Sequence, residues 1–154
     1  MVRALEERLG DHAHVIDLLE RRVEPFTYGR FDDRDDFRRI VQGMSKCQSI
    51  VIATPVYWYA MSGIMKSFLD RFTDLLMMDD GKRLGRSLAG RKLWLMATGT
   101  DPELPPGFSE PFMGTAAYFG MEFAGSVYAR SVSGAPLVGA ELEGVRKLVR
   151  ELVG

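Results

Sequence analysis

Three consecutive aromatic residues, Tyr57, Trp58 and Tyr59, lie in a loop that directly follows an apolar, β-branched run. The loop spans residues 54–63, with a proline near its start and a glycine at its end. Aromatic faces stack against flat heteroaromatic ligands, and the N–H groups of a tight loop donate to ring heteroatoms whatever the side chains are. These residue types therefore indicate a binding site for a flat heteroaromatic molecule.

A second loop, residues 98–107, follows another apolar run and opens with Thr98, Gly99 and Thr100. Both loops come directly after predicted strands, so both are expected at the carboxyl edge of a parallel sheet, where open α/β sheets bind ligands. A structural interpretation of the aromatic residues stays open, in which they fold back onto the next helix or form a subunit contact.

The elements that must position these loops follow from the hydrophobic periodicity, which predicts alternating strands and helices. The predicted strands are residues 14–18, 50–53, 93–97 and 123–129. The predicted helices are residues 2–9, 34–44 with Asp33 as N-cap, 61–76, 110–119 between Ser109 and Gly120, and 142–152. In the fourth of these helices, Phe112, Met113, Ala116 and Phe119 are expected to face inward. This order predicts an α/β fold, a flavodoxin-like open parallel sheet with helices on both faces and the strand order 2-1-3-4-5.

The length and charge of the chain narrow the classes of function. We expect its 154 residues to form a single domain over 1–154. Twenty basic and 21 acidic residues give a net charge of −1, which disfavours a nucleic-acid partner. The single cysteine, Cys47, cannot form an intrachain disulfide and cannot alone build a metal site, so no metal is expected.

Targeting signals are not evident in the sequence. The longest uninterrupted apolar stretch, Val56 to Met61, is far shorter than the roughly 20 residues that a membrane-spanning helix needs. The first nine residues are charged throughout and lack the apolar run of a secretory signal. We therefore expect a cytoplasmic protein with no membrane partner.

Several stretches together resemble the NADPH-dependent FMN reductases. The resemblance is carried first by Ile52–Gly63, which is similar to the second flavin-contacting loop of that family, and by the helix after it, with its Lys66-Ser67-Phe68-Leu69-Asp70-Arg71. Residues 88–92, 97–100 and 118–125 also resemble the family. The resemblance extends from about residue 13 to the C-terminus. Within the helix, we expect Asp70 and Arg71 to form a structural ion pair and Lys66 to be a solvated or interface charge.

The resemblance implies an FMN site made of two loops. Its cofactor-binding residues would be Thr54, Pro55, Val56, Tyr57, Trp58 and Gly63 in the first loop and Thr98, Gly99 and Thr100 in the second. It also implies an oxidoreductase that passes hydride from NAD(P)H through bound FMN to an electron-poor small molecule such as a flavin or a quinone. Because the cofactor carries this chemistry, no catalytic side chain is implied, and His12 and His14 are expected to be ordinary surface or strand residues. A homodimer is implied, with Trp58 and Tyr59 partly covered in it.

A flavodoxin-like domain normally opens with a strand and a Ser/Thr/Asn/Gly-rich loop that binds the flavin phosphate at a helix N-terminus. This sequence begins instead within a predicted helix, on which Val2, Leu5 and Leu9 have helical spacing. We therefore expect roughly 25–30 further residues, a strand, a loop and half a helix, to be encoded upstream of Met1. The expected first strand is central, so without it the backbone groups of both its neighbours lack partners.

Three other functions compete with the reductase. A non-enzymatic flavodoxin-fold remnant or partner-binding module, with weak or no FMN binding, would keep the aromatic loop as an interface. A phospho-receiver domain shares the fold but needs an acidic residue where this chain has Thr54. A dinucleotide-binding Rossmann domain needs a Gly-x-Gly-x-x-Gly after a strand, which the sequence lacks.

Overall fold

The computed structural model describes residues 1–28, 35–77, 79–131 and 139–153. Its sheet has the strand order β2-β1-β3-β4. The three long strands are parallel neighbours, and the short β2 runs antiparallel to β1. The strands are β1 (Ser49–Tyr57), β2 (Ala60–Met61), β3 (Lys92–Gly99) and β4 (Glu122–Arg130).

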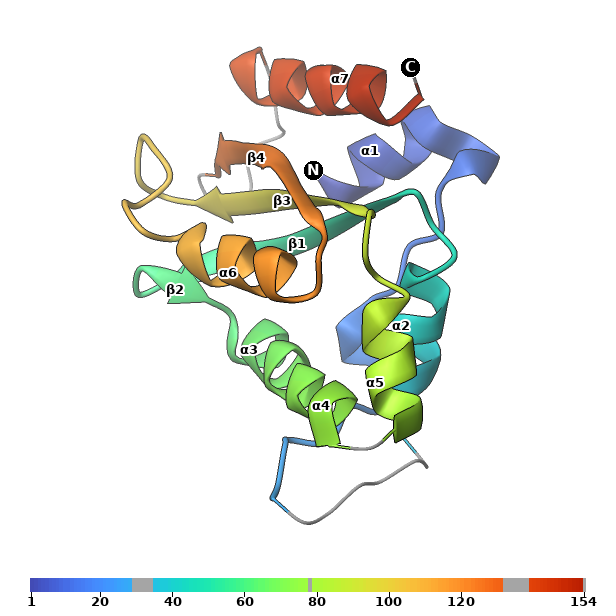
Figure 1. Cartoon of the computed structure of the whole chain (residues 1–154). Helices are drawn as coiled ribbons and strands as arrows, with labels where there is room; N and C mark the ends of the chain where they lie inside the picture. Colours follow the sequence, from blue (N-terminus) through green and yellow to red (C-terminus); the bar gives the residue numbers. More distant parts are fainter. Residues whose placement is uncertain (29–34, 78, 132–138, 154) are drawn as a thin grey trace.

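Helices cover both faces of this sheet (Figure 1). One face carries α1 (Val2–Leu9) and α7 (Ala140–Val153), over a core that includes Leu5, Leu9, Trp94, Met96, Val145 and Leu148. The other face carries α2 (Phe37–Met44), α3 (Gly63–Asp70), α4 (Asp74–Met77), α5 (Asp79–Arg86) and α6 (Glu110–Tyr118), over a larger core. This three-layer α/β architecture confirms the predicted fold class.

Strand β1 explains why the sequence shows no alternation at this point. Ile50 and Ile52 are buried in the larger core, while Val51 and Ala53 pack against the smaller core on the opposite face. A strand that is covered on both faces needs apolar residues at every position. The same reason applies to β3, in which residues 93–97 are all buried, so both central strands were correctly predicted.

The predicted strand at residues 14–18 is wrong. In the structure, Ala13–Asp17 has no regular secondary structure, and Leu18–Glu20 forms a 3₁₀ turn. The carboxylate of Asp17 accepts a hydrogen bond of 2.9 Å from the N–H of Leu19, which starts this turn. A strand needs a ladder partner, and none of the described strands pairs with this segment.

One edge of β1 remains open for most of its length. On the side where β2 lies, β2 pairs only with Val56 and Tyr57, so Ser49–Pro55 has no partner strand in the described part of the chain. The strand expected upstream of Met1 stays a prediction.

The helix predicted over residues 61–76 is not continuous. Met61 belongs to β2, α3 ends at Asp70, a 3₁₀ turn spans Arg71–Thr73, and α4 follows. The expected pair of Asp70 with Arg71 is also wrong, because Asp70 pairs with Lys66 and the buried Arg71 pairs with Asp35 and Asp74. The guanidinium of Arg71 thereby ties the break in the helix to the start of α2.

Three other helices differ from the predictions in detail. Helix α2 begins at Phe37, and the predicted N-cap Asp33 lies outside the described residues. On α6 the predicted inner face holds for Phe112 and Ala116, but Met113 is 42% exposed. Helix α5 was not predicted, because its sequence is polar and contains two glycines, which pack it closely against α4 and Phe119.

The other two predicted helices and the last predicted strand agree with the structure. Helix α1 ends before Gly10, which has a positive φ of 51°, and α7 covers the predicted closing helix. Strand β4 contains the predicted residues 123–129. Among the described residues, no helix combines the length and the apolar character needed to cross a membrane.

Candidate functional site

The aromatic loop is a tight β-hairpin at the carboxyl end of β1. Val56 pairs with Met61 and Tyr57 with Ala60, which leaves Trp58 and Tyr59 as a two-residue turn. Both have positive φ, 50° and 64°, as a type I′ hairpin turn requires. This conformation normally selects Asn or Gly, and for a bulky residue it costs on the order of 1–3 kcal/mol. The turn is therefore strained, and the surrounding structure must hold it.

A buried hydroxyl group closes the base of this hairpin. Oγ1 of Thr54, a residue only 4% exposed, accepts a hydrogen bond of 3.1 Å from the N–H of Ser62. Oγ of Ser62 lies 3.4 Å from Thr54 Oγ1 and accepts the N–H of Met65 in the first turn of α3. We call this Thr54–Ser62 connection the clasp. It joins the strand that enters the hairpin to the helix that leaves it.

The aromatic side chains of the turn face solvent. Tyr57 is 61% exposed, Trp58 95% and Tyr59 72%. The interpretation in which all three fold back onto the next helix is therefore wrong. Large exposed aromatic groups on one strained loop are typical of a surface that binds a ligand or another protein.

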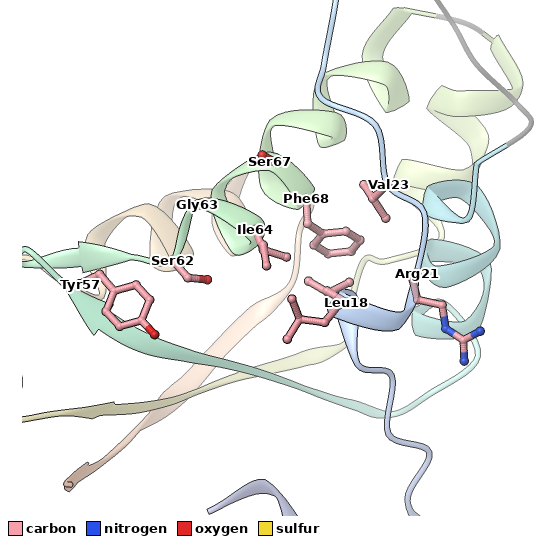
Figure 2. A pocket seen from close by; sticks show the side chains of 10 residues that line it. Leu18, Arg21, Val23, Tyr57, Ser62, Gly63, Ile64, Ser67 and Phe68 are labelled. Atoms are coloured by element: carbon pink, nitrogen blue, oxygen red, sulfur yellow. The ribbon is translucent and has the colours of Figure 1, made fainter. Parts of the chain in front are cut away.

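A cavity of about 510 Å³ lies beside the hairpin. Figure 2 shows that its walls come from α3, from Tyr57 at the end of β1 and from the segment that begins at Leu18. This volume lies within the range of roughly 300–1,000 Å³ typical of small-molecule sites. The lining is mostly apolar. Among the described residues, its one charged side chain is that of Arg21. The lining residues are Leu18, Leu19, Arg21, Val23, Tyr57, Ser62, Gly63, Ile64, Ser67 and Phe68.

Two backbone donors in the cavity wall lack partners. The first N–H groups of a helix have no intrahelical acceptor. In α3 the N–H of Met65 is bound by Ser62 Oγ and that of Lys66 by Ser62 O, but no described residue accepts from Gly63 or Ile64. A Cβ atom on Gly63 would meet nothing within 4 Å, so the space next to it is open. Both residues line the cavity, so their unpaired N–H groups are candidate donors to a ligand that carries acceptors.

The second predicted loop lies next to the first across the sheet. Thr98 pairs with Pro55 in the β1–β3 ladder, and a Cβ on Gly99 would stand 3.1 Å from Cβ of Val56. The sheet therefore brings the two loops together at its carboxyl edge, as predicted. Thr98, Gly99 and Thr100 do not line the cavity, however.

Two side chains of β4 hold the second loop, and sequence reasoning missed both. The hydroxyl of Tyr128 donates to the carbonyl of Asp101 at 2.8 Å, and Nε of Arg130 donates to the carbonyl of Thr100 at 2.9 Å. A Cβ on Gly99 would lie only 2.9 Å from the Tyr128 hydroxyl. The parallel register that brings these β4 residues beside the loop has no local signal in the sequence.

The nine predicted site residues occupy different positions around this edge. Tyr57 and Gly63 line the cavity, and Trp58 is at the exposed turn. Thr54 is buried and directs its hydroxyl to Ser62, while Pro55 and Val56 are half-buried beside the second loop. Sequence reasoning also missed the opposite wall of the cavity, residues 18–23, because that segment is far from the loop along the chain.

Replacing Tyr128 with Phe is expected to lower the free energy of unfolding by about 1 kcal/mol, through loss of the hydrogen bond to Asp101. Partial burial, and then the charge of Asp101, raise the pKa of the Tyr128 hydroxyl above its usual value. When the pKa of a group is higher in the folded than in the unfolded protein, the group stabilises the folded state. This stabilisation is full at pH values below the pKa of the unfolded protein and is lost as the pH rises through the pKa of the folded protein. The advantage of wild type over Y128F should therefore be full at pH 8 and shrink in the alkaline range. Urea unfolding at several pH values measures it, and a pH-independent difference would contradict it.

The sequence profile of one protein family, NADPH-dependent FMN reductase, matches residues 1–103. Among curated proteins, the "Putative NAD(P)H-dependent FMN-containing oxidoreductase YwqN" of Bacillus subtilis (strain 168) is 28% identical over 96 residues. The match covers 61% of this chain and 53% of the relative. The chain therefore spans about half the length of the curated relative that it matches.

Solved structures share the fold. The Trp repressor binding protein of Bacillus subtilis has a TM-score of 0.74 at 20% identity, covering 99% of this chain and 88% of the other. An FMN-dependent NADH-azoreductase of Bacillus anthracis str. Ames Ancestor, solved in complex with FMN, has a TM-score of 0.60 at 11% identity, covering 98% and 83%. At these identities the similarity is one of fold.

Proposed function

The chain belongs to the NADPH-dependent FMN reductase family, and from that premise we propose that it is an FMN-dependent NAD(P)H oxidoreductase. Its acceptor is an electron-poor small molecule, such as a free flavin or a quinone. The family profile and the curated relative support the type of reaction. The acceptor follows only from the apolar character of the cavity and its exposed aromatic rim.

The observation that carries this proposal is the donor-bearing cavity beside the aromatic hairpin. A flavin ring system is flat, and its pyrimidine part carries carbonyl and nitrogen acceptors. The unpaired N–H groups of Gly63 and Ile64 suit such acceptors, and the ring of Tyr57 and the side chains of Ile64 and Phe68 suit an aromatic surface. The donor set of the chain therefore fits the heterocycle of FMN.

Each predicted site residue has a proposed role. Tyr57 and Trp58 provide the stacking surface, Gly63 the open space and a donor, and Thr98 to Thr100 the neighbouring loop that limits access from β3. Pro55 and Val56 separate the two loops, and Thr54 acts inside the fold rather than on the ligand, because its hydroxyl is buried and engaged.

When bound, FMN supplies hydride acceptance from a reduced nicotinamide and electron delivery to the acceptor. The contribution of the chain is to bind and orient the ring, exclude water from one face of it and leave the other face open to substrates. No side chain is assigned as a catalytic acid or base.

We place the protein in the cytoplasm, as a single domain that forms a homodimer. The exposed turn supports the dimer, because Trp58 and Tyr59 together form a large apolar surface that a subunit contact would cover. Size-exclusion chromatography with light scattering tests this part, and a monomer at high micromolar concentration would refute it.

Titration with FMN, followed by flavin absorbance and fluorescence, tests the function. We expect saturable binding and bleaching of the bound flavin absorbance on addition of NADPH under anaerobic conditions. A chain that folds but binds no FMN would favour the alternative, a non-enzymatic flavodoxin-fold module that uses the aromatic hairpin as an interface.

Filling the cavity should abolish binding without unfolding the protein. Gly63 lines the cavity and a Cβ there meets nothing within 4 Å, so the side chain of Gly63→Trp would occupy cavity space without displacing protein atoms at its base. We therefore expect FMN affinity to fall at least about tenfold with little change in thermal stability. Gly114→Trp is the matched control, because Gly114 is exposed on α6 and its Cβ also meets nothing within 4 Å. Equal FMN affinity in both variants would show that the ligand binds elsewhere.

A further inference from the structure

The strained turn at Trp58 and Tyr59 needs a source of constraint. Two bulky residues with positive φ occupy it, and neither is buried: Trp58 is 95% exposed and Tyr59 72%. Packing of the turn side chains therefore cannot hold this conformation. The constraint must come from the base of the hairpin, where the chain enters from β1 and leaves into α3.

The base of the hairpin is held by few contacts. Strand β2 has only two residues, so the ladder consists of the pairs Val56–Met61 and Tyr57–Ala60. Beyond it, the next connection between the two arms is the clasp, in which Thr54 Oγ1 accepts the N–H of Ser62. Thr54 is itself fixed, because it is 4% exposed and pairs with Ala97 in the parallel ladder of β1 and β3.

The clasp also sets the start of α3. Ser62 is the N-cap of this helix, and its Oγ accepts the N–H of Met65 at 3.3 Å while it lies 3.4 Å from Thr54 Oγ1. The hydroxyl of Thr54 is thus connected to the hairpin through the Ser62 N–H and to the helix through the Ser62 hydroxyl. The two unpaired donors in the cavity wall, at Gly63 and Ile64, follow directly after this point.

We infer that Thr54 is a positioning residue, which through Ser62 holds the aromatic turn and the first turn of α3 in the arrangement that binds a flat heteroaromatic ligand. The identity of the ligand in this assignment rests on the proposed function, whereas the structural role of the clasp does not. It differs from direct cofactor contact, the role expected from the sequence, because the Thr54 hydroxyl is buried and occupied by Ser62.

Thr54→Val tests this role, because valine keeps the shape and the β-branched side chain but removes the acceptor. We expect hydrogen exchange at the Ser62 amide to become at least tenfold faster and the dissociation constant for FMN to rise about tenfold. Thr54→Ser retains the hydroxyl, so it should stay within about twofold of wild type in both measurements.

Ile52→Val is the matched control for a general loss of stability. Ile52 is buried on the same face of β1, two residues before Thr54, and makes no contribution to the clasp. It should reduce the thermal midpoint while leaving Ser62 exchange and FMN affinity near wild type. The positioning role would be overturned if Ile52→Val weakened FMN binding as much as Thr54→Val. It would also be overturned if Thr54→Ser bound FMN as weakly as Thr54→Val.

The two proposals fail in different ways. If wild type binds no FMN, the proposed function fails, and the claim that the clasp holds the hairpin is then decided by Ser62 exchange alone. If wild type binds FMN and Thr54→Val binds it equally well, the function stands and the positioning role fails.

Discussion

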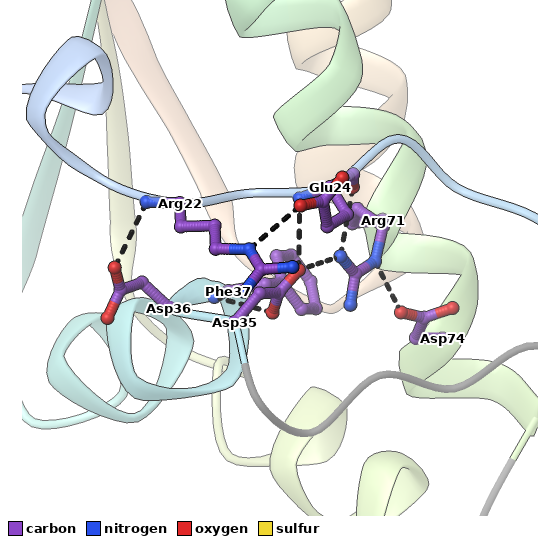
Figure 3. Close-up of polar contacts among 7 residues, drawn as sticks. All are labelled: Arg22, Glu24, Asp35, Asp36, Phe37, Arg71 and Asp74. Carbon is purple, nitrogen blue, oxygen red and sulfur yellow. Dashed lines mark hydrogen bonds and ion pairs between the residues drawn. The ribbon is translucent and has the colours of Figure 1, made fainter.

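Replacing Arg71 with Met should lower the free energy of unfolding by about 3–5 kcal/mol, because it leaves buried carboxylates without their partner. Arg71 is 5% exposed, and its guanidinium pairs with Asp35 and, at 2.6 Å, with Asp74 (Figure 3). It also donates to the carbonyl of Glu24 at 2.9 Å and lies 4.9 Å from the centre of the Phe37 ring. Methionine fills similar space but satisfies none of these groups.

The positive charge of Arg71 is stabilised by the two carboxylates beside it. Burial alone would lower the pKa of the guanidinium, but the hydrogen bonds and charges of Asp35 and Asp74 raise it above its usual value. The carboxylate of Asp35 additionally accepts the N–H groups of Glu24 and Phe37, both at 3.1 Å. Loss of Arg71 therefore loosens a connection between α2, α4 and the segment around Glu24.

Urea unfolding followed by circular dichroism measures the effect. Lys66→Met is the control, because Lys66 forms an exposed pair with Asp70 on α3, and such pairs contribute at most about 1 kcal/mol. Arg71→Lys keeps a positive charge but not the planar geometry of the guanidinium, so its free energy of unfolding should fall by an intermediate amount. If Arg71→Met does not fold, Arg71→Lys can still be compared with Lys66→Met. Equal losses for Arg71→Met and Lys66→Met would contradict the role of the buried network.

Gly81→Ala should destabilise the protein by about 1–3 kcal/mol, although alanine is the better helix former. Gly81 lies in α5, and a Cβ at this position would stand 2.7 Å from the backbone oxygen of Asp74 and 3.2 Å from Cα of Leu75. Because both atoms belong to the backbone of α4, no side-chain rotation relieves the contact. The two helices must move apart, which disturbs packing at the buried Leu75.

Gly114→Ala is expected to change the stability of the protein in the opposite direction. Gly114 is an exposed position of α6 where a Cβ meets nothing within 4 Å, so the higher helix propensity of alanine should stabilise the protein by about 0.5–1 kcal/mol. Thermal unfolding of the two variants side by side checks both signs. A stabilising Gly81→Ala would mean that α4 and α5 are not packed as closely as described.

The candidate site could be predicted from the sequence in part. The aromatic loop and the loop after β3 could be located from the sequence, because each directly follows a continuous apolar run. Such a run is typical of a strand that is buried on both faces of a sheet. The break at Arg71 could not be predicted, because it depends on Asp35, a partner distant in the chain. Helix α5 could not be predicted, because its polar sequence with two glycines carries Leu84 as its one large apolar residue.

The sequence by itself determined the three long parallel strands β1, β3 and β4 and the position of the aromatic residues at the carboxyl edge of the sheet. These follow from periodicity and from the length of apolar runs, which act through near neighbours. Only the tertiary structure decided that Thr54 faces inward to Ser62, that Trp58 and Tyr59 have left-handed conformations, and that residues 18–23 form the far wall of the cavity. Each of these depends on which backbone or side-chain group lies opposite in the folded chain, and local composition does not encode that.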